Sequence, residues 1–136
     1  MTNANDGTLT LVIEQEIPAE QDLVWRALTD SDLIEQWLMP NNFQPKVGQP
    51  FNLMGDWGTV ECKVIQIVPT ELLVYTWSAY GLDSTVSYFL KPSAVGTTIR
   101  VEQAGFKAEQ QQFYEGAKGG WQQFLANLEK VVASLA

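Results

Sequence analysis

The chain has 136 residues, of which 46% are hydrophobic and 18% charged, a composition that predicts a folded rather than a disordered polypeptide. Eight Lys and Arg against sixteen Asp and Glu give a net charge of −8, which disfavours nucleic acid and anionic membrane surfaces as partners. The sequence contains no histidine, so triads and metal sites that use histidine are excluded.

The N-terminal residues 1–7 are polar, and we expect them to be disordered or extended, ahead of one domain over residues 8–136. They contain no basic start or apolar run, and no stretch of about 18 uninterrupted apolar residues occurs. We therefore expect a cytoplasmic protein without membrane insertion. Cys62 is the only cysteine, so no internal disulfide can form, and its alternating apolar neighbours predict a buried thiol.

The first third of the chain predicts one strand and two short helices. Apolar and polar residues alternate over 8–16, as in a half-buried strand that ends at Pro18. Proline followed by acidic residues over 18–22 predicts the first turn of a helix. Residues 29–31 break this helix and cap a second one, in which apolar residues recur at helical spacing over 33–38.

The middle of the chain predicts an antiparallel sheet. Residues 40–50 carry three prolines and one glycine and form a long connection. Short segments rich in turn-forming residues follow, at 55–58, 69–71, 80–83 and 92–96. They separate predicted strands at 51–54, 59–68, 72–79, 85–90 and 97–103. Joins of hairpin length imply that neighbouring strands are antiparallel.

The end of the chain predicts one long amphipathic helix, because apolar residues follow steps of three and four from Phe113 to Leu135. This helix must cover the apolar face of the sheet. The expected fold is therefore α+β: a curved antiparallel sheet of about six strands, in the order β-α-α-β-β-β-β-β-α, wrapped round the C-terminal helix.

Three motifs spread over nearly the whole chain carry a family resemblance. The first is Ile-Pro-Ala at 17–19 with Val-Trp-Arg-Ala-Leu-Thr-Asp at 24–30, and the second is Leu33 with Gln36 and Trp37. The third is Leu-Leu-Val-Tyr-Thr-Trp at 72–77, followed by the closing pattern of Gly120, Trp121, Phe124, Leu125 and Leu128. In this order they resemble the bacterial homologues of the activator of the heat-shock chaperone ATPase, within the START-like or Bet-v-type superfamily.

The resemblance implies a helix-grip fold with an apolar cavity between the sheet and the C-terminal helix. Superfamily relatives bind lipids or other hydrophobic molecules, cyclise or hydrolyse polyketide-like substrates, or act as co-chaperones, so the fold alone does not select an activity. The larger eukaryotic activators have a separate N-terminal chaperone-docking domain, for which 136 residues leave no room. We therefore expect ligand binding rather than chaperone activation.

The leading hypothesis is a binding protein for a small hydrophobic molecule, either a lipid or a polyketide-like or aromatic compound. The alternatives are a co-chaperone that contacts a heat-shock chaperone, and a cyclase-like or hydrolase-like enzyme that uses a carboxylate or tyrosine in the same cavity. We expect no cofactor or metal and a monomer or weak homodimer. The predicted cavity wall consists of Trp37, Met39, Met54, Trp57, Cys62, Tyr75, Trp77, Tyr88, Trp121, Phe124 and Leu125.

Several of these residues also fit a packed core. Methionine and cysteine fill irregular gaps in ordinary cores, and aromatic residues bury large areas in any small domain. Gly119 and Gly120 each weaken a helix, and they would either clear space for a ligand or mark a kink or close packing. Tyr75 and Trp77 share one face of their strand, but the sequence leaves open which face is inward.

Charged residues on the predicted strands are more informative. Glu61, Lys63, Arg100 and Glu102 alternate with apolar neighbours, so we expect them to face solvent in cross-strand ion pairs. In the alternative, Glu61 or Arg100 faces the cavity and orients a polar ligand group.

Overall fold

The computed structural model describes residues 8–56 and 58–135. The segment 1–7, predicted to be disordered or extended, and Trp57 lie outside the described residues. A strand β1 (Thr8–Ile17) is followed by helices α1 (Gln21–Thr29) and α2 (Ser31–Trp37). The chain then forms β2 (Pro50–Gly55), β3 (Gly58–Val68), β4 (Leu72–Ala79), β5 (Leu82–Pro92), β6 (Thr97–Lys107), a short 3-10 helix η2 (Ala108–Gln110) and α3 (Gln111–Leu135).

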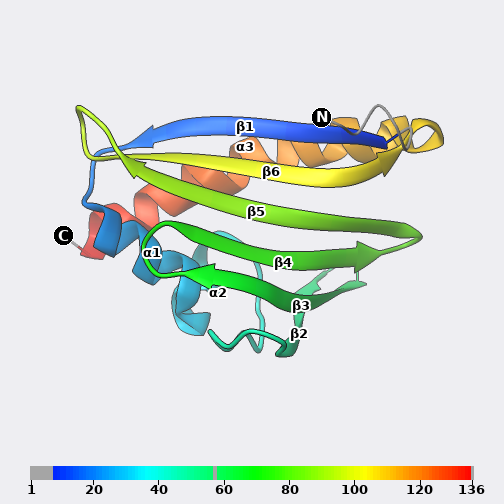
Figure 1. Ribbon diagram of the computed structural model, residues 1–136, viewed down its shortest axis with the longest axis horizontal. Coiled ribbons are helices and arrows are strands. Elements are labelled where there is room, and N and C mark those ends of the chain that lie inside the picture. Colours follow the sequence, from blue (N-terminus) through cyan, green and yellow to red (C-terminus); the bar gives the residue numbers. More distant parts are fainter. Residues whose placement is uncertain (1–7, 57, 136) are drawn as a thin grey trace.

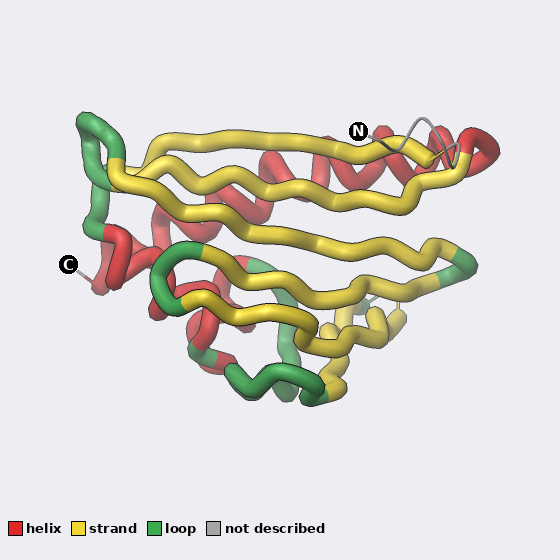
Figure 2. The backbone as a smooth tube through the Cα atoms, viewed as in Figure 1, coloured by secondary structure: helices red, strands yellow, loops and turns green. Residues whose placement is uncertain are grey.

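The strands form one six-stranded antiparallel sheet in the order β1-β6-β5-β4-β3-β2. The first strand of the chain therefore lies beside the last one, and the hairpins that connect β2 to β6 make up the rest of the sheet (Figure 1). All helices lie on one face, with α3 running behind β1, β6 and β5 (Figure 2). This confirms the predicted α+β, helix-grip arrangement and the predicted order of elements.

The turn between β4 and β5 is tighter than the sequence predicts. Tyr80 and Gly81 have φ values of 52° and 83°, and Ala79 pairs directly with Leu82. Two residues with positive φ make the tight hairpin whose twist matches that of the flanking strands. The strand β5 consequently begins at Leu82, not at residue 85, and the predicted turn over 80–83 is too long by two residues.

The helix α1 begins later than predicted. The Thr97 hydroxyl at the start of β6 donates to the Ala19 carbonyl oxygen at 2.7 Å, and the Ala19 amide donates to the Ile17 carbonyl oxygen. These bonds hold Ala19 in the link between β1 and the helix. Glu20 is therefore the N-cap, the first turn begins at Gln21, and Pro18 precedes the helix.

The interior lies between the sheet and the helices. Along β3, Val60, Cys62 and Val64 are buried, whereas Glu61 and Lys63 point to solvent. The largest fully buried side chains include Trp37, Trp121, Tyr88 and Phe106. Tyr75 and Trp77 are both buried, so their shared face is the inward one. None of the described helices is long and apolar enough to cross a membrane.

Candidate functional site

An apolar groove of about 320 Å³ opens between the first half of α3 and the ends of β4, β5 and β6. Trp77 and Leu82 line it from the sheet, Met39 from the segment after α2, and Phe113, Trp121 and Phe124 from α3. None of the described residues that line the groove carries a charge. The groove is therefore suited to an apolar occupant.

Two indoles form the inner wall of the groove. The ring centroids of Trp77 and Trp121 lie 5.6 Å apart with an interplanar angle of 52°. Phe124 meets the Trp121 ring edge to face, with 5.6 Å between centroids. Trp121 is only 2% exposed, because its other contacts are to the core. Aromatic pairs in such geometries are stabilising beyond the area that they bury, so the wall is fixed in position.

A directed chain of hydrogen bonds links the Trp121 indole to the backbone of Trp77. The Trp121 Nε1–H donates to Gln103 Oε1 at 2.8 Å, Gln103 Nε2 donates to Ser84 Oγ at 3.0 Å, and Ser84 Oγ donates to the Trp77 carbonyl oxygen at 2.9 Å. Gln103 is 2% exposed and lies on the groove wall. Neither Gln103 nor Ser84 was among the predicted site residues, and the direct neighbours of Gln103, Glu102 and Ala104, gave no clear signal that its side chain is buried.

Close packing does not explain the three glycines of α3, because a side chain at each position would have space. A Cβ at Gly116 or Gly119 would meet no atom within 4 Å, and one at Gly120 would meet only Phe124 Cε2, at 3.8 Å. Each costs about 0.5–1 kcal/mol of helix stability relative to alanine. Gly116 and Gly120 line the groove, whereas Gly119 does not. The side-chain-free strip is therefore 116 and 120, one turn apart, and not the predicted pair 119 and 120.

Some of the predicted wall residues line the groove, some lie outside it or outside the described residues, and the rest are buried in the core. Met39, Trp77, Trp121 and Phe124 line the groove. Met54 is 42% exposed and borders a neighbouring hollow, and Trp57 lies outside the described residues. The remainder are buried in the core and do not line the groove: Trp37, Cys62, Tyr75, Tyr88 and Leu125. A role in ligand contact stays a prediction for every residue in this set.

The region behind Trp121 is filled by side chains. Tyr88 meets the Trp121 ring edge to face at 5.8 Å between centroids, and the Tyr88 and Tyr75 hydroxyl oxygens are 2.5 Å apart. Burial raises the pKa of both tyrosines well above the ordinary value. The Trp37 Nε1–H donates to the Ala27 carbonyl oxygen at 2.8 Å. This part of the interior is therefore a packed core that stays uncharged.

The thiol of Cys62 belongs to the same core, and we expect it to be chemically inert in the folded protein. Burial raises the pKa of Cys62 to about 12, and the thiolate is the reactive form. Iodoacetamide at about pH 8, near the pKa of a free thiol, should alkylate Cys62 in denaturant but not in buffer, as read by mass spectrometry. Alkylation of the native protein at the rate of a free thiol would contradict the packed core.

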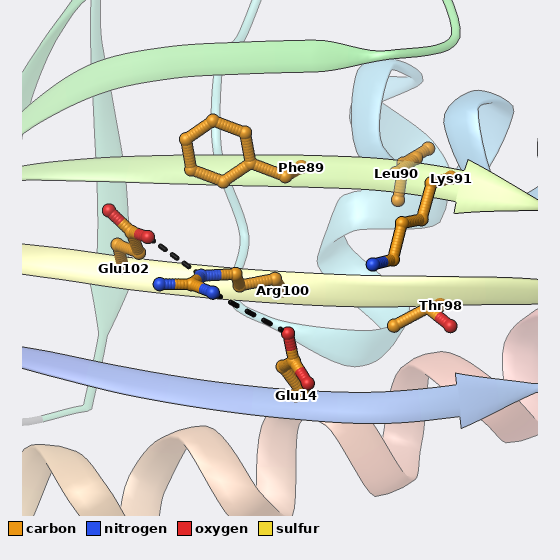
Figure 3. A pocket seen from close by; sticks show the side chains of 7 residues that line it. All are labelled: Glu14, Phe89, Leu90, Lys91, Thr98, Arg100 and Glu102. Carbon is orange, nitrogen blue, oxygen red and sulfur yellow. Dashed lines mark hydrogen bonds and ion pairs between the residues drawn. The ribbon is translucent and has the colours of Figure 1, made fainter.

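A second hollow, of about 310 Å³, lies on the outer face of the sheet and is lined by charged residues. Figure 3 shows Arg100 on β6 between Glu14 on β1 and Glu102, with N–O distances of 3.7 and 2.7 Å. The prediction that Arg100 and Glu102 face solvent is confirmed. Exposed ion pairs of this kind contribute little to stability, and Arg100 does not reach the groove.

Residues 18–133 match the family described as activator of Hsp90 ATPase homolog 1-like protein, AHSA1. The chain belongs to the AHSA1 family. The match covers both short helices, the whole sheet beyond β1 and nearly all of α3, so the resemblance seen in the sequence is confirmed. None of the curated proteins compared with the chain matches it.

Solved structures of bacterial proteins show the same fold. Protein MLL2253 from Mesorhizobium loti is 41% identical, with a TM-score of 0.90 over 94% of this chain and 99% of that chain. CalU16 from Micromonospora echinospora is 26% identical, with a TM-score of 0.79 over 90% of this chain and 75% of that chain. Protein BH1534 from Bacillus halodurans, 24% identical with a TM-score of 0.81 over 91% and 96%, shows the fold alone. All three structures share the fold of this chain.

Proposed function

We propose that this protein binds a small hydrophobic molecule, of the lipid or polyketide-like and aromatic kind, in the groove between the sheet and α3. The observation that carries the proposal is the groove itself, which has aromatic walls, no charged lining residue among those described and a volume of about 320 Å³. Ligand sites are typically concave, mostly apolar and a few hundred Å³ in volume. Membership of the AHSA1 family is consistent with this role.

The walls are preorganised for binding. The Trp77 and Trp121 rings contact each other, and the Trp121 indole is also held by its hydrogen bond to Gln103, which Ser84 links to the Trp77 backbone. A ligand that enters therefore does not have to order them, and less of its interaction energy is lost to side-chain entropy. Burial of apolar surface supplies the affinity, at roughly 25 cal/mol per Å² before the entropic cost of association.

The chemistry of the groove favours binding over catalysis. A hydrolase or cyclase needs a general acid, base or nucleophile within reach of its substrate. The described lining residues include no carboxylate, cysteine or lysine. One tyrosine, Tyr80, lines the groove and is 68% exposed, and the two deeply buried tyrosines lie behind Trp121. No cluster of three or more potential metal-ligating side chains occurs among the residues that the structure describes.

Ligand binding is tested with a library of neutral and anionic apolar compounds, read by melting temperature and tryptophan emission. A ligand at about one hundred times its Kd stabilises the folded state by about 2.7 kcal/mol, which raises Tm by several degrees in a domain of this size. Emission should change because Trp77 and Trp121 form the wall. A library that changes neither signal would contradict the proposal.

The glycine strip provides a matched pair of variants. Gly120→Leu should abolish the ligand-induced shift in Tm, because its side chain would extend from the groove wall, and a Cβ there meets only Phe124 at 3.8 Å, so the fold is kept. Gly119→Leu makes the same change one residue away, outside the groove. It should bind ligand as the unmodified protein does. Equal binding by both variants would place the ligand elsewhere.

A further inference from the structure

The groove contains one deeply buried amide, and its orientation is fixed by its neighbours. The indole N–H of Trp121 is a donor only, so the Gln103 atom 2.8 Å away must be the oxygen Oε1. The other end of the amide, Nε2, consequently points toward Ser84 and carries two hydrogens. The hydrogen bonds therefore decide which end of the Gln103 amide is oxygen and which is nitrogen, an assignment that is ambiguous for many glutamines.

Only one of the two amide hydrogens is used. Ser84 Oγ accepts a hydrogen bond from one of them at 3.0 Å and donates its own hydroxyl hydrogen bond to the Trp77 carbonyl oxygen. Within the described part of the chain, Ser84 Oγ is the one acceptor to which Gln103 Nε2 donates. A buried donor without an acceptor is costly, and Gln103 is 2% exposed on the groove wall. An acceptor oxygen on a ligand would satisfy it.

The charge of the site restricts that ligand to neutral molecules. The described lining residues contain no cation, and the chain carries a net charge of −8. A carboxylate or phosphate brought into the groove would lose its hydration without gaining an opposite charge. A neutral carbonyl group provides the acceptor without that penalty.

The shape and composition of the walls favour flat rings. Phe113, Trp121 and Phe124 present aromatic side chains from α3, and Trp77 does so from β4. Gly116 and Gly120 leave a strip of helix surface free of side chains between them. Stacked or edge-to-face ring contacts add to the energy of area burial, and a planar molecule gains them with little loss of conformational entropy.

We propose that the groove selects neutral aromatic carbonyl compounds, whose carbonyl oxygen accepts the second amide hydrogen of Gln103. The proposal rests on the proposed function and adds its specificity: Trp77, Trp121 and Phe124 hold the rings, and Gln103 chooses the functional group. Gln103 also positions Trp121, so its test must separate recognition of the carbonyl from support of the indole.

The test compares 9-fluorenone with fluorene, two flat molecules that differ by the carbonyl oxygen. Titrations followed by tryptophan emission should give about tenfold tighter binding of fluorenone, as expected for one buried hydrogen bond gained. The infrared carbonyl stretch of bound fluorenone should move to lower wavenumber than in a dry apolar solvent. Both measurements use the unmodified protein, so neither depends on whether a variant folds.

Two variants test whether the Gln103 amide is the donor that shifts the carbonyl band. Gln103→Met removes the donor and should erase both the preference for fluorenone and the infrared shift. Gln122→Met makes the same change on the exposed side of α3, outside the groove, so both signals should remain. Equal binding of fluorenone and fluorene, or an unshifted carbonyl band, would overturn the role of Gln103 and leave the groove as a binding site. If neither compound binds and the wider library changes neither Tm nor emission, both the role of Gln103 and the proposed function are wrong.

Discussion

Deletion of residues 110–136, which contain α3, should leave a chain that does not fold cooperatively. Trp121, Leu125, Leu128, Val131 and Val132 of α3 are buried against the rest of the molecule. Without them, the apolar face of the sheet loses its longest cover, and α1 and α2 lose the helix on which they pack. Circular dichroism during heating should show a broad change without a sigmoidal transition.

The control for this deletion is a change on the exposed side of the same helix. Lys118→Ala and Gln122→Ala replace solvent-facing residues and should change the free energy of unfolding by no more than about 0.5 kcal/mol. A truncated chain that melts sigmoidally, with a native-like spectrum, would show that α1 and α2 alone cover the sheet. The helix-grip interpretation of the stability would then be wrong.

Much of the fold follows from local pattern. A mostly apolar run between two turn-rich segments predicts β4 with both of its bounds, 72–79. Two of the bounds that differ, the starts of α1 and β5, involve an interaction at long range or an unusual backbone conformation. The start of α1 depends on the hydrogen bond from Thr97 to Ala19, 78 positions apart in the chain. The start of β5 depends on positive φ at Tyr80, which is uncommon for a residue other than glycine.

The site was less predictable, because facing inward is not the same as lining a groove. Tyr88 and Trp121 are both inward-facing aromatic residues in ring contact, but only Trp121 reaches the groove. Whether an inward-facing residue reaches the groove depends on which helices cover that part of the sheet. Helices α1 and α2 lie near one end of the sheet, and the first half of α3 lies toward the other end (Figure 1). The groove lies along this half of α3. Strand alternation and helix periodicity contain no information about that placement.

The polar part of the site illustrates a second limit. The sequence shows Gln103 between Glu102 and Ala104 on a strand, which is compatible with an exposed or a buried side chain. Its role depends on Trp121, 18 positions away in the chain, whose indole N–H fixes the amide. Pairwise side-chain geometry of this kind becomes visible only when the sheet and α3 are placed together.

The substitution Trp121→Ala should lower the free energy of unfolding by about 3–5 kcal/mol, the usual cost of removing a large aromatic side chain from a core. The indole is 2% exposed and contacts Trp77, Tyr88 and Phe124. Its loss also leaves Gln103 Oε1 without its donor. Since small domains are stable by only about 5–15 kcal/mol, the variant should be close to the limit of folding.

Urea denaturation followed by circular dichroism measures this loss, provided that the slope of unfolding with denaturant is unchanged. Trp121→Phe is the matched control, because it keeps a ring beside Trp77 and Tyr88 but removes the N–H bond to Gln103. It should cost less than the alanine variant, at roughly 1–3 kcal/mol, the penalty for a buried acceptor left unpaired. A loss below about 1 kcal/mol for Trp121→Ala would mean that the indole borders empty space on most sides. The groove would then extend behind Trp121 to the Tyr75 and Tyr88 hydroxyls, and the packed core described for that region would be wrong.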